Sequence, residues 1–156
     1  MSISKDIKDL IITTVNGLST TQAVYGYEKL DPNGWPCVWV KTDDLQGTFA
    51  TTAENRRIYG YKLTSIFPLG EDFVKDSSVQ REEYAENVLA DVVDQIINAI
   101  DDTAFLDTIN DFTSGDTTGL FIEAADATWG EIDMQLGKAK AVQISLMIHT
   151  DYNVTT

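Results

Sequence analysis

The side chains that could carry out chemistry in this sequence are carboxylates, a single histidine and a single cysteine. His149 and Cys37 are the only residues of their kinds. A Cys/His nucleophile pair or a zinc site needs several such groups that converge, so neither can be argued here. Cys37 cannot form an internal disulfide, and it lies among strand-forming residues in PCVWV. We therefore interpret it as a buried, inert thiol, because free cysteine behaves as a small hydrophobe.

Acidic segments are the remaining candidates for a metal site or a hydrolytic centre. The three that could supply converging oxygens are Asp43 with Asp44, Asp101 with Asp102, and residues 111–116. None of them has the D-x-[DN]-x-[DN]-G spacing of a calcium loop, and no glycine-rich phosphate loop occurs. They are either solvated turns and helix ends or the carboxylates of a small hydrolase. No pair is singled out, so we predict no catalytic residue, metal or cofactor.

A basic pair, Arg56 and Arg57, interrupts an otherwise acidic chain. The sequence has 25 Asp plus Glu against 11 Lys plus Arg, for a formal net charge of -14. This balance argues against a surface that binds nucleic-acid phosphates, which needs clustered basic residues. The pair and the nearby Glu54 form either a solvated loop or half of a subunit contact, in which arginine pairs with carboxylates. Six tyrosines and three tryptophans also exceed what one sheet face can bury, and spare aromatics suit interfaces.

The pattern of apolar residues predicts a central strand and a long helix that positions it. Residues 57–67 alternate in the two-residue period of a strand, with Tyr59, Tyr61 and Phe67 on one face. Residues 79–100 carry a broad apolar stripe at helical spacing, with Ser77 placed to cap the helix. We expect this helix to pack on the aromatic face of the strand.

The remaining elements are predicted to be shorter. We expect an amphipathic helix within residues 4–16, ended by Gly17, and a short helix within 101–111. We expect strands at 23–28 and 37–41 on the two sides of the turn 31–36, in a connection longer than a minimal hairpin. Residues 42–46 should form a hairpin connection between 37–41 and a strand at 47–52, and further strands are expected at 120–124, 131–136 and 141–149.

This order of elements predicts one α+β domain over residues 1–156. Its sheet should be mostly antiparallel, with the long helix and the N-terminal helix packed on one face. No apolar run approaches the roughly 20 residues of a membrane span. The N-terminus, MSISKDIKDL, also lacks the apolar run of a secretory signal. We therefore expect a protein made in a cytosol-like compartment.

Four parts follow one another along the chain: the N-terminal amphipathic helix, the segment PCVWVKTDDLQGTFATTAENRRIYGYKLTSIFPLG, the helix VQREEYAENVLADVVDQIINAI and the closing strands. Together they resemble the tail terminator proteins of tailed bacteriophages. The resemblance implies a structural virion protein of the neck, not an enzyme, that assembles in the host cytoplasm. Its partners would be further copies in a hexameric ring, the tail tube protein, and a head–tail connector or stopper protein. The ring would end tube polymerisation and let DNA pass through its central channel.

A ring also gives the charged residues a role. The basic residues of one copy would meet the acidic surface of the next, so we take Glu54, Arg56, Arg57, Asp43 and Asp44 as candidate interface residues. An acidic channel would repel DNA within a Debye length of about 8 Å at physiological salt, which favours passage over binding. Two alternatives remain: another ring component of the neck or tail, such as a stopper or tube subunit, and a carboxylate-dependent hydrolase.

Overall fold

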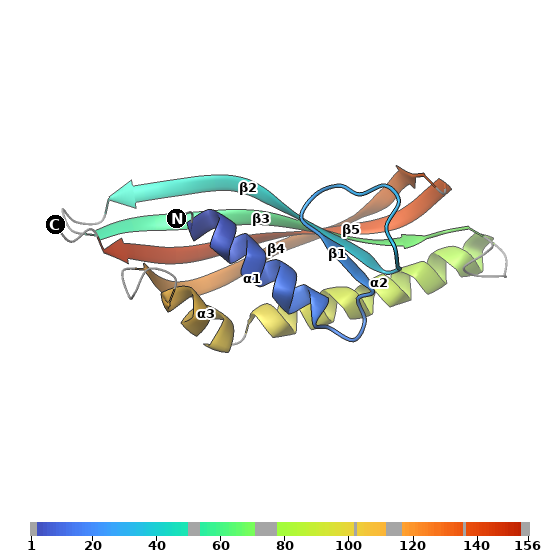
Figure 1. The fold of residues 1–156 in the computed structure, drawn as a ribbon. Coiled ribbons are helices and arrows are strands. Elements are labelled where there is room, and N and C mark those ends of the chain that lie inside the picture. Colours follow the sequence, from blue (N-terminus) through green and yellow to red (C-terminus); the bar gives the residue numbers. More distant parts are fainter. Residues whose placement is uncertain are drawn as a thin grey trace.

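The computed structural model describes residues 3–49, 54–70, 78–101, 103–111, 117–135 and 137–153. Figure 1 shows a long, twisted sheet with three helices along one side. The elements in chain order are α1 (Ile3–Asn16), β1 (Ala23–Tyr25), β2 (Cys37–Phe49), β3 (Glu54–Pro68), α2 (Ser78–Ile100), α3 (Thr103–Asn110), β4 (Thr117–Met134) and β5 (Gly137–Asn153). The predicted α+β class is confirmed.

The sheet has five strands in the order β1-β2-β3-β5-β4. β3 lies at its centre and pairs antiparallel with β2 on one side and with β5 on the other. β4 and β5 form an antiparallel hairpin, and Gly137 at its turn has a φ of 126°, which favours glycine. The predicted central position of β3 in the sheet is therefore confirmed.

The main core lies between the helices and one face of the sheet, which we call the helix-covered face. Tyr59, Tyr61, Leu63 and Phe67 of β3 share this core with the apolar stripe of α2, as predicted. α1 contributes Ile7, Ile11 and Val15. The two-residue period of β3 and the helical period of α2 were sufficient to predict which faces meet.

The opposite, helix-free face is covered at one end by the segment 26–36, which connects β1 to β2. The indole Nε1 of Trp39 donates to the carbonyl of Lys29 at 3.2 Å, and the backbone N–H of Gln135 donates to the carbonyl of Leu30 at 3.2 Å. Cys37 is buried beneath this segment, as predicted. Burial raises the pKa of its thiol to about 12, so the thiol stays protonated at neutral pH.

One predicted connection is wrong because its residues belong to a strand. Thr42–Gln46 was expected to link two strands, but it lies within β2. The register shifts between Thr42, which pairs with Tyr61, and Leu45, which pairs with Tyr59. Asp43 and Asp44 therefore lie opposite Gly60 in a β-bulge, which accommodates polar residues without ending the strand. The expected strand at 47–52 ends at Phe49, and residues 50–52 lie outside the described part.

The pairing of the N-terminal strands and the length of β4 also differ from the prediction. β1 and β2 flank the turn 31–36 as expected, but they pair parallel instead of as a hairpin. Strands predicted at 120–124 and 131–136 are parts of the single strand β4, whose register shifts between Gly119 and Phe121 and again between Ala125 and Thr128. The last position of the expected strand 131–136 and the predicted helix cap Ser77 lie outside the described residues.

Candidate subunit interface

The first candidate residue, Arg56, is paired within its own chain. Its Nε lies 2.8 Å from Oδ1 of Asp151, which is the register partner of Arg56 on β5. The side chains are 41% and 29% exposed, so the pair contributes at most about 1 kcal/mol to stability. A carboxylate of a neighbouring copy could therefore bind the Arg56 guanidinium only alongside Asp151, because that guanidinium is already paired.

The two arginines do not form one patch. They are consecutive residues of β3, so their side chains leave opposite faces of the sheet. The expectation of a basic loop is wrong, because Glu54 to Arg57 belong to β3 and pair with β5. The hydroxyl of Thr150 donates to the carbonyl of Arg57 at 3.1 Å, which ties this part of β3 to β5.

The structure does not place the acidic candidate residues next to the two arginines of the same chain. Asp43 is exposed in the bulge of β2, whereas the β2 residues opposite Arg57 and Arg56 are Gly47 and Thr48. This offset along the strand corresponds to about 10 Å or more. Asp44 and Glu54 have described backbones in β2 and β3, but their side chains lie outside the described part.

An aromatic and charged cluster lies beside Arg56 and Asp151 on the helix-free face. His149 is 8% exposed, and its ring stacks on Phe121 with centroids 4.0 Å apart. Its Nε2 lies 3.2 Å from Oε1 of Glu123 without forming a well-aligned hydrogen bond. Within the described ranges, no group of three or more His, Cys, Asp or Glu side chains is placed to hold a metal ion. Of the acidic pairs, Asp102 and Asp116 lie outside those ranges.

Both sides of the sheet end in long strand edges. No described strand pairs with the outer edge of β4, or with the outer edge of β2 from Val40 to Phe49. Figure 1 shows β2 and β4 on opposite sides of the sheet. The unpaired N–H and C=O groups of such edges are templates for pairing with another chain.

The directions of these two edges are complementary. β2, β3, β5 and β4 are joined by successive antiparallel pairings, so β2 and β4 run in opposite directions. Two copies placed side by side in the same orientation would therefore present β4 of one antiparallel to β2 of the next. Antiparallel strands exchange regular backbone hydrogen bonds.

Two small cavities open on the described surface. One, of about 200 Å³, lies where α2 ends and is lined by Ile97, Ile100, Asp101, Ile122 and Leu146. The other, of about 190 Å³, is a shallow hollow on the helix-free face over β3, β4 and β5, with Thr64, Thr128 and Gln143 among its lining residues. The residues that line the first are mainly apolar, with Asp101 the one acidic residue among those named.

None of the described helices is both long enough and apolar enough to span a bilayer. Comparison with models of known protein families and with curated protein sequences gives no match.

Sequence reasoning missed the free edges and the cavity. The edges were hidden because β2 and β4 were each predicted as two shorter strands, and a register shift lies in the interval between them. Residues of α2, β4 and β5 line the cavity at the end of α2, and no local pattern in the sequence indicates that these three elements meet there. The surplus of aromatic residues was the one available signal, since Tyr27, Tyr84 and Trp129 are exposed.

Proposed function

We propose that this protein is a structural ring subunit of the phage tail-terminator type. Six copies form a ring on the last ring of the tail tube, end tube polymerisation and provide the docking surface for the head connector. The observation that carries the proposal is the pair of long, oppositely directed strand edges on the two sides of one sheet.

Edge pairing supports a ring because it uses two different surfaces of the same chain. A contact in which the β4 edge of one copy meets the β2 edge of the next is heterologous, and repeated heterologous contacts close into a ring when the rotation between copies allows it. The ring size of six and the tail partners come from the resemblance to terminators. The sheet supports only the mode of assembly.

The charge of the chain supports a channel through which DNA passes without binding. Each copy carries a formal charge of -14, so a ring concentrates negative charge around its opening. Such a field repels the phosphate backbone at distances within the Debye length. Subunits of the same sign also repel each other, which limits assembly until backbone pairing or a tube end offsets the repulsion.

A tube-capping assay tests this function. Purified protein is added to tail tube subunits during polymerisation, and tube lengths and ends are measured by negative-stain electron microscopy. A terminator shortens the tubes and adds one ring at an end. Tubes that lengthen by incorporating the protein would indicate a tube subunit. Unchanged lengths with bare ends would contradict the proposal.

A further inference from the structure

Two asparagine–glycine pairs occur in this sequence, Asn16-Gly17 and Asn33-Gly34, and their surroundings in the structure differ. An asparagine that precedes glycine can lose its side-chain amide without an enzyme. The backbone nitrogen of the glycine attacks the side-chain carbonyl carbon, and no Cβ hinders its approach. The reaction needs an exposed asparagine side chain and a following N–H group that is not held in a hydrogen bond.

The first pair, Asn16-Gly17, has an exposed side chain but a held N–H group. Asn16 is the last residue of α1. The backbone N–H of Gly17 donates to the carbonyl of Thr13 at 3.2 Å and to that of Thr14 at 3.3 Å. Attack on Asn16 would first require both hydrogen bonds to break, which opens the last turn of the helix. The end of α1 therefore protects Asn16.

The second pair, Asn33-Gly34, has no such protection. It lies in the segment 26–36, outside helix and strand, and Asn33 is exposed. The backbone N–H of Asn33 itself donates to the Tyr25 hydroxyl at 3.0 Å. In the part of the chain that the structure describes, neither the Asn33 side-chain amide nor the backbone N–H of Gly34 has a hydrogen-bond partner. The attacking nitrogen and the carbonyl carbon are therefore both available.

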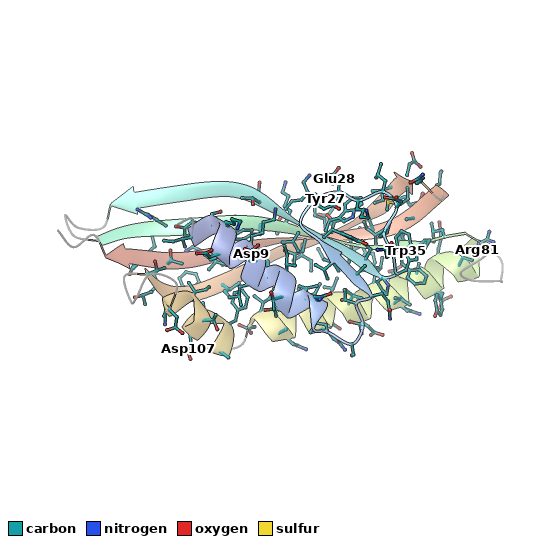
Figure 2. All side chains as sticks on the ribbon, viewed as in Figure 1. Asp9, Tyr27, Glu28, Trp35, Arg81 and Asp107 are labelled. Carbon is teal, nitrogen blue, oxygen red and sulfur yellow. The ribbon has the colours of Figure 1, made fainter. Side chains whose placement is uncertain are left out.

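Packing keeps glycine at position 34. A Cβ at this position would lie 2.9 Å from the Cβ of Gln22, which is closer than real Cβ atoms come. Figure 2 shows Tyr27 and Glu28 earlier in the same segment and Trp35 directly after Gly34. The close approach to Gln22 thus requires the one residue type that leaves the following nitrogen unhindered.

We propose that Asn33 is a site of spontaneous deamidation in the folded protein, whereas Asn16 stays intact. The Gly34 nitrogen gives its proton to a base in the solvent and bonds to the side-chain carbonyl carbon of Asn33. The bond from that carbon to the side-chain nitrogen breaks, and this nitrogen takes up a proton and leaves as ammonia. Water then opens the resulting five-membered succinimide ring. Water is consumed and ammonia is released, with no oxidation or reduction.

The two directions of ring opening give two products. Opening at the side-chain carbonyl yields aspartate, and opening at the main-chain carbonyl yields isoaspartate, in which the backbone runs through the former side chain. Either product adds a negative charge to a chain that already carries -14. Isoaspartate also lengthens the backbone of the segment that covers Cys37. This chemistry does not depend on the proposed ring.

Peptide mapping of the folded protein tests the proposal. The protein is incubated in a mildly alkaline buffer, which favours loss of the backbone N–H proton, and samples are digested with trypsin at intervals. Trypsin places Asn16 in peptide 9–29 and Asn33 in peptide 30–41, and neither peptide contains another asparagine. Mass spectrometry detects the replacement of the amide NH2 by OH. Labelling with a protein isoaspartyl methyltransferase identifies isoaspartate.

We expect Asn33 to be modified about tenfold faster than Asn16, or more, because backbone hydrogen bonds protect only the Asn16 pair. In guanidinium chloride, where the chain is unfolded, the two rates should become similar. Asn33→Gln should remove the signal from peptide 30–41, since a longer side chain must close a larger ring. A rate at Asn33 equal to or below that at Asn16 in the folded protein would overturn the proposal. A difference that persists in the unfolded chain would also contradict it, because the fold would not be its cause.

Discussion

At the scale of single residues, Ser65 places a hydroxyl in the middle of the main core. Its side chain is fully buried on the helix-covered face of β3, where the register partners are Val38 and Val142. Its Oγ has no hydrogen-bond partner in the structure. Such a group opposes folding, because it loses its bond to water and gains nothing in return.

The first prediction is that Ser65→Ala leaves stability unchanged or raises it by about 1 kcal/mol, since the unsatisfied hydroxyl is removed and little volume is lost. Urea unfolding at neutral pH measures this difference. Leu63→Ala, at the neighbouring buried position of the same face, serves as the control and should destabilise by about 2–5 kcal/mol. A loss above about 1 kcal/mol in Ser65→Ala would mean that the hydroxyl does have a partner.

Two buried acids make the fold sensitive to alkali. Burial raises the pKa of Tyr61 from 10.0 to about 12, although a hydrogen bond with the Ser4 side chain lowers it. The Tyr61 hydroxyl also donates to the Ser4 carbonyl at 2.7 Å. Burial likewise raises the pKa of Cys37 from 9.0 to about 12. Each group loses its proton more readily in the unfolded chain than in the folded one. Their contribution to stability is therefore complete below about pH 9 and is lost as the pH rises towards 12.

The second prediction follows from Tyr61. Between about pH 8 and pH 11, the free energy of unfolding should fall, and Tyr61 alone should account for about 1 kcal/mol of that fall. Tyr61→Phe should be less stable than the wild type at pH 8, by about 1 kcal/mol, because it loses the bond to Ser4. Its further loss on going to pH 11 should be smaller. Parallel losses in the two proteins would show that Tyr61 does not titrate with folding.

The third prediction concerns the two arginines. The double variant Arg56→Glu with Arg57→Glu should weaken ring assembly about tenfold or more, as expected when interface charges are reversed. Reversal of Lys5 and Lys138, two exposed basic residues, changes the net charge equally and serves as the control. Assembly is followed by sedimentation velocity. An intact ring in the Arg56/Arg57 variant would remove these residues from the interface.

At the scale of elements, the proposed assembly depends on the free edge of β2. Successive residues of an edge strand direct their N–H groups alternately towards the paired strand and outwards. Lys41 and Thr42 are adjacent and exposed on β2. Proline removes an N–H group, so its effect at these two positions separates the inner ladder from the outer edge.

The fourth prediction is that one of the variants Lys41→Pro and Thr42→Pro keeps the melting temperature of the wild type and loses assembly. The other removes a bond to β3 and should lower the melting temperature as well. Differential scanning fluorimetry and sedimentation velocity, performed on both, distinguish the two effects. If the proline variant that retains wild-type stability also forms rings, the outer edge of β2 is not a subunit contact.

The elements also show what sequence could and could not predict. The faces of β3 and α2 followed from periodicity, because Tyr59, Tyr61 and Phe67 alternate regularly and the helix stripe is broad. β2 was divided because Asp43 and Asp44 resemble a turn, and only the pairing with Gly60 makes them a bulge. The bond between Arg56 and Asp151 depends on a register between distant strands, which no local pattern specifies. The parallel pairing of β1 likewise depends on tertiary contacts, such as the hydrogen bond that the backbone N–H of Gln22 donates to the Pro36 carbonyl at 3.0 Å.

At the scale of the whole molecule, backbone pairing and charge oppose each other. The edges of β2 and β4 favour addition of further copies, whereas the charge of -14 on each copy disfavours it. Salt shortens the Debye length from about 10 Å at 0.1 M to about 3 Å at 1 M, so it weakens the repulsion and leaves the backbone hydrogen bonds in place. In the proposed ring, this balance between backbone pairing and charge repulsion would set the conditions under which the copies assemble.

The fifth prediction is the most direct test of a ring-forming subunit: the solution mass, measured by multi-angle light scattering at two protein concentrations, at low and high salt, with and without tail tubes. We predict a closed assembly of six copies whose population rises with salt, or a monomer that joins such a ring only when tubes are present. A strict monomer under all these conditions would contradict the account.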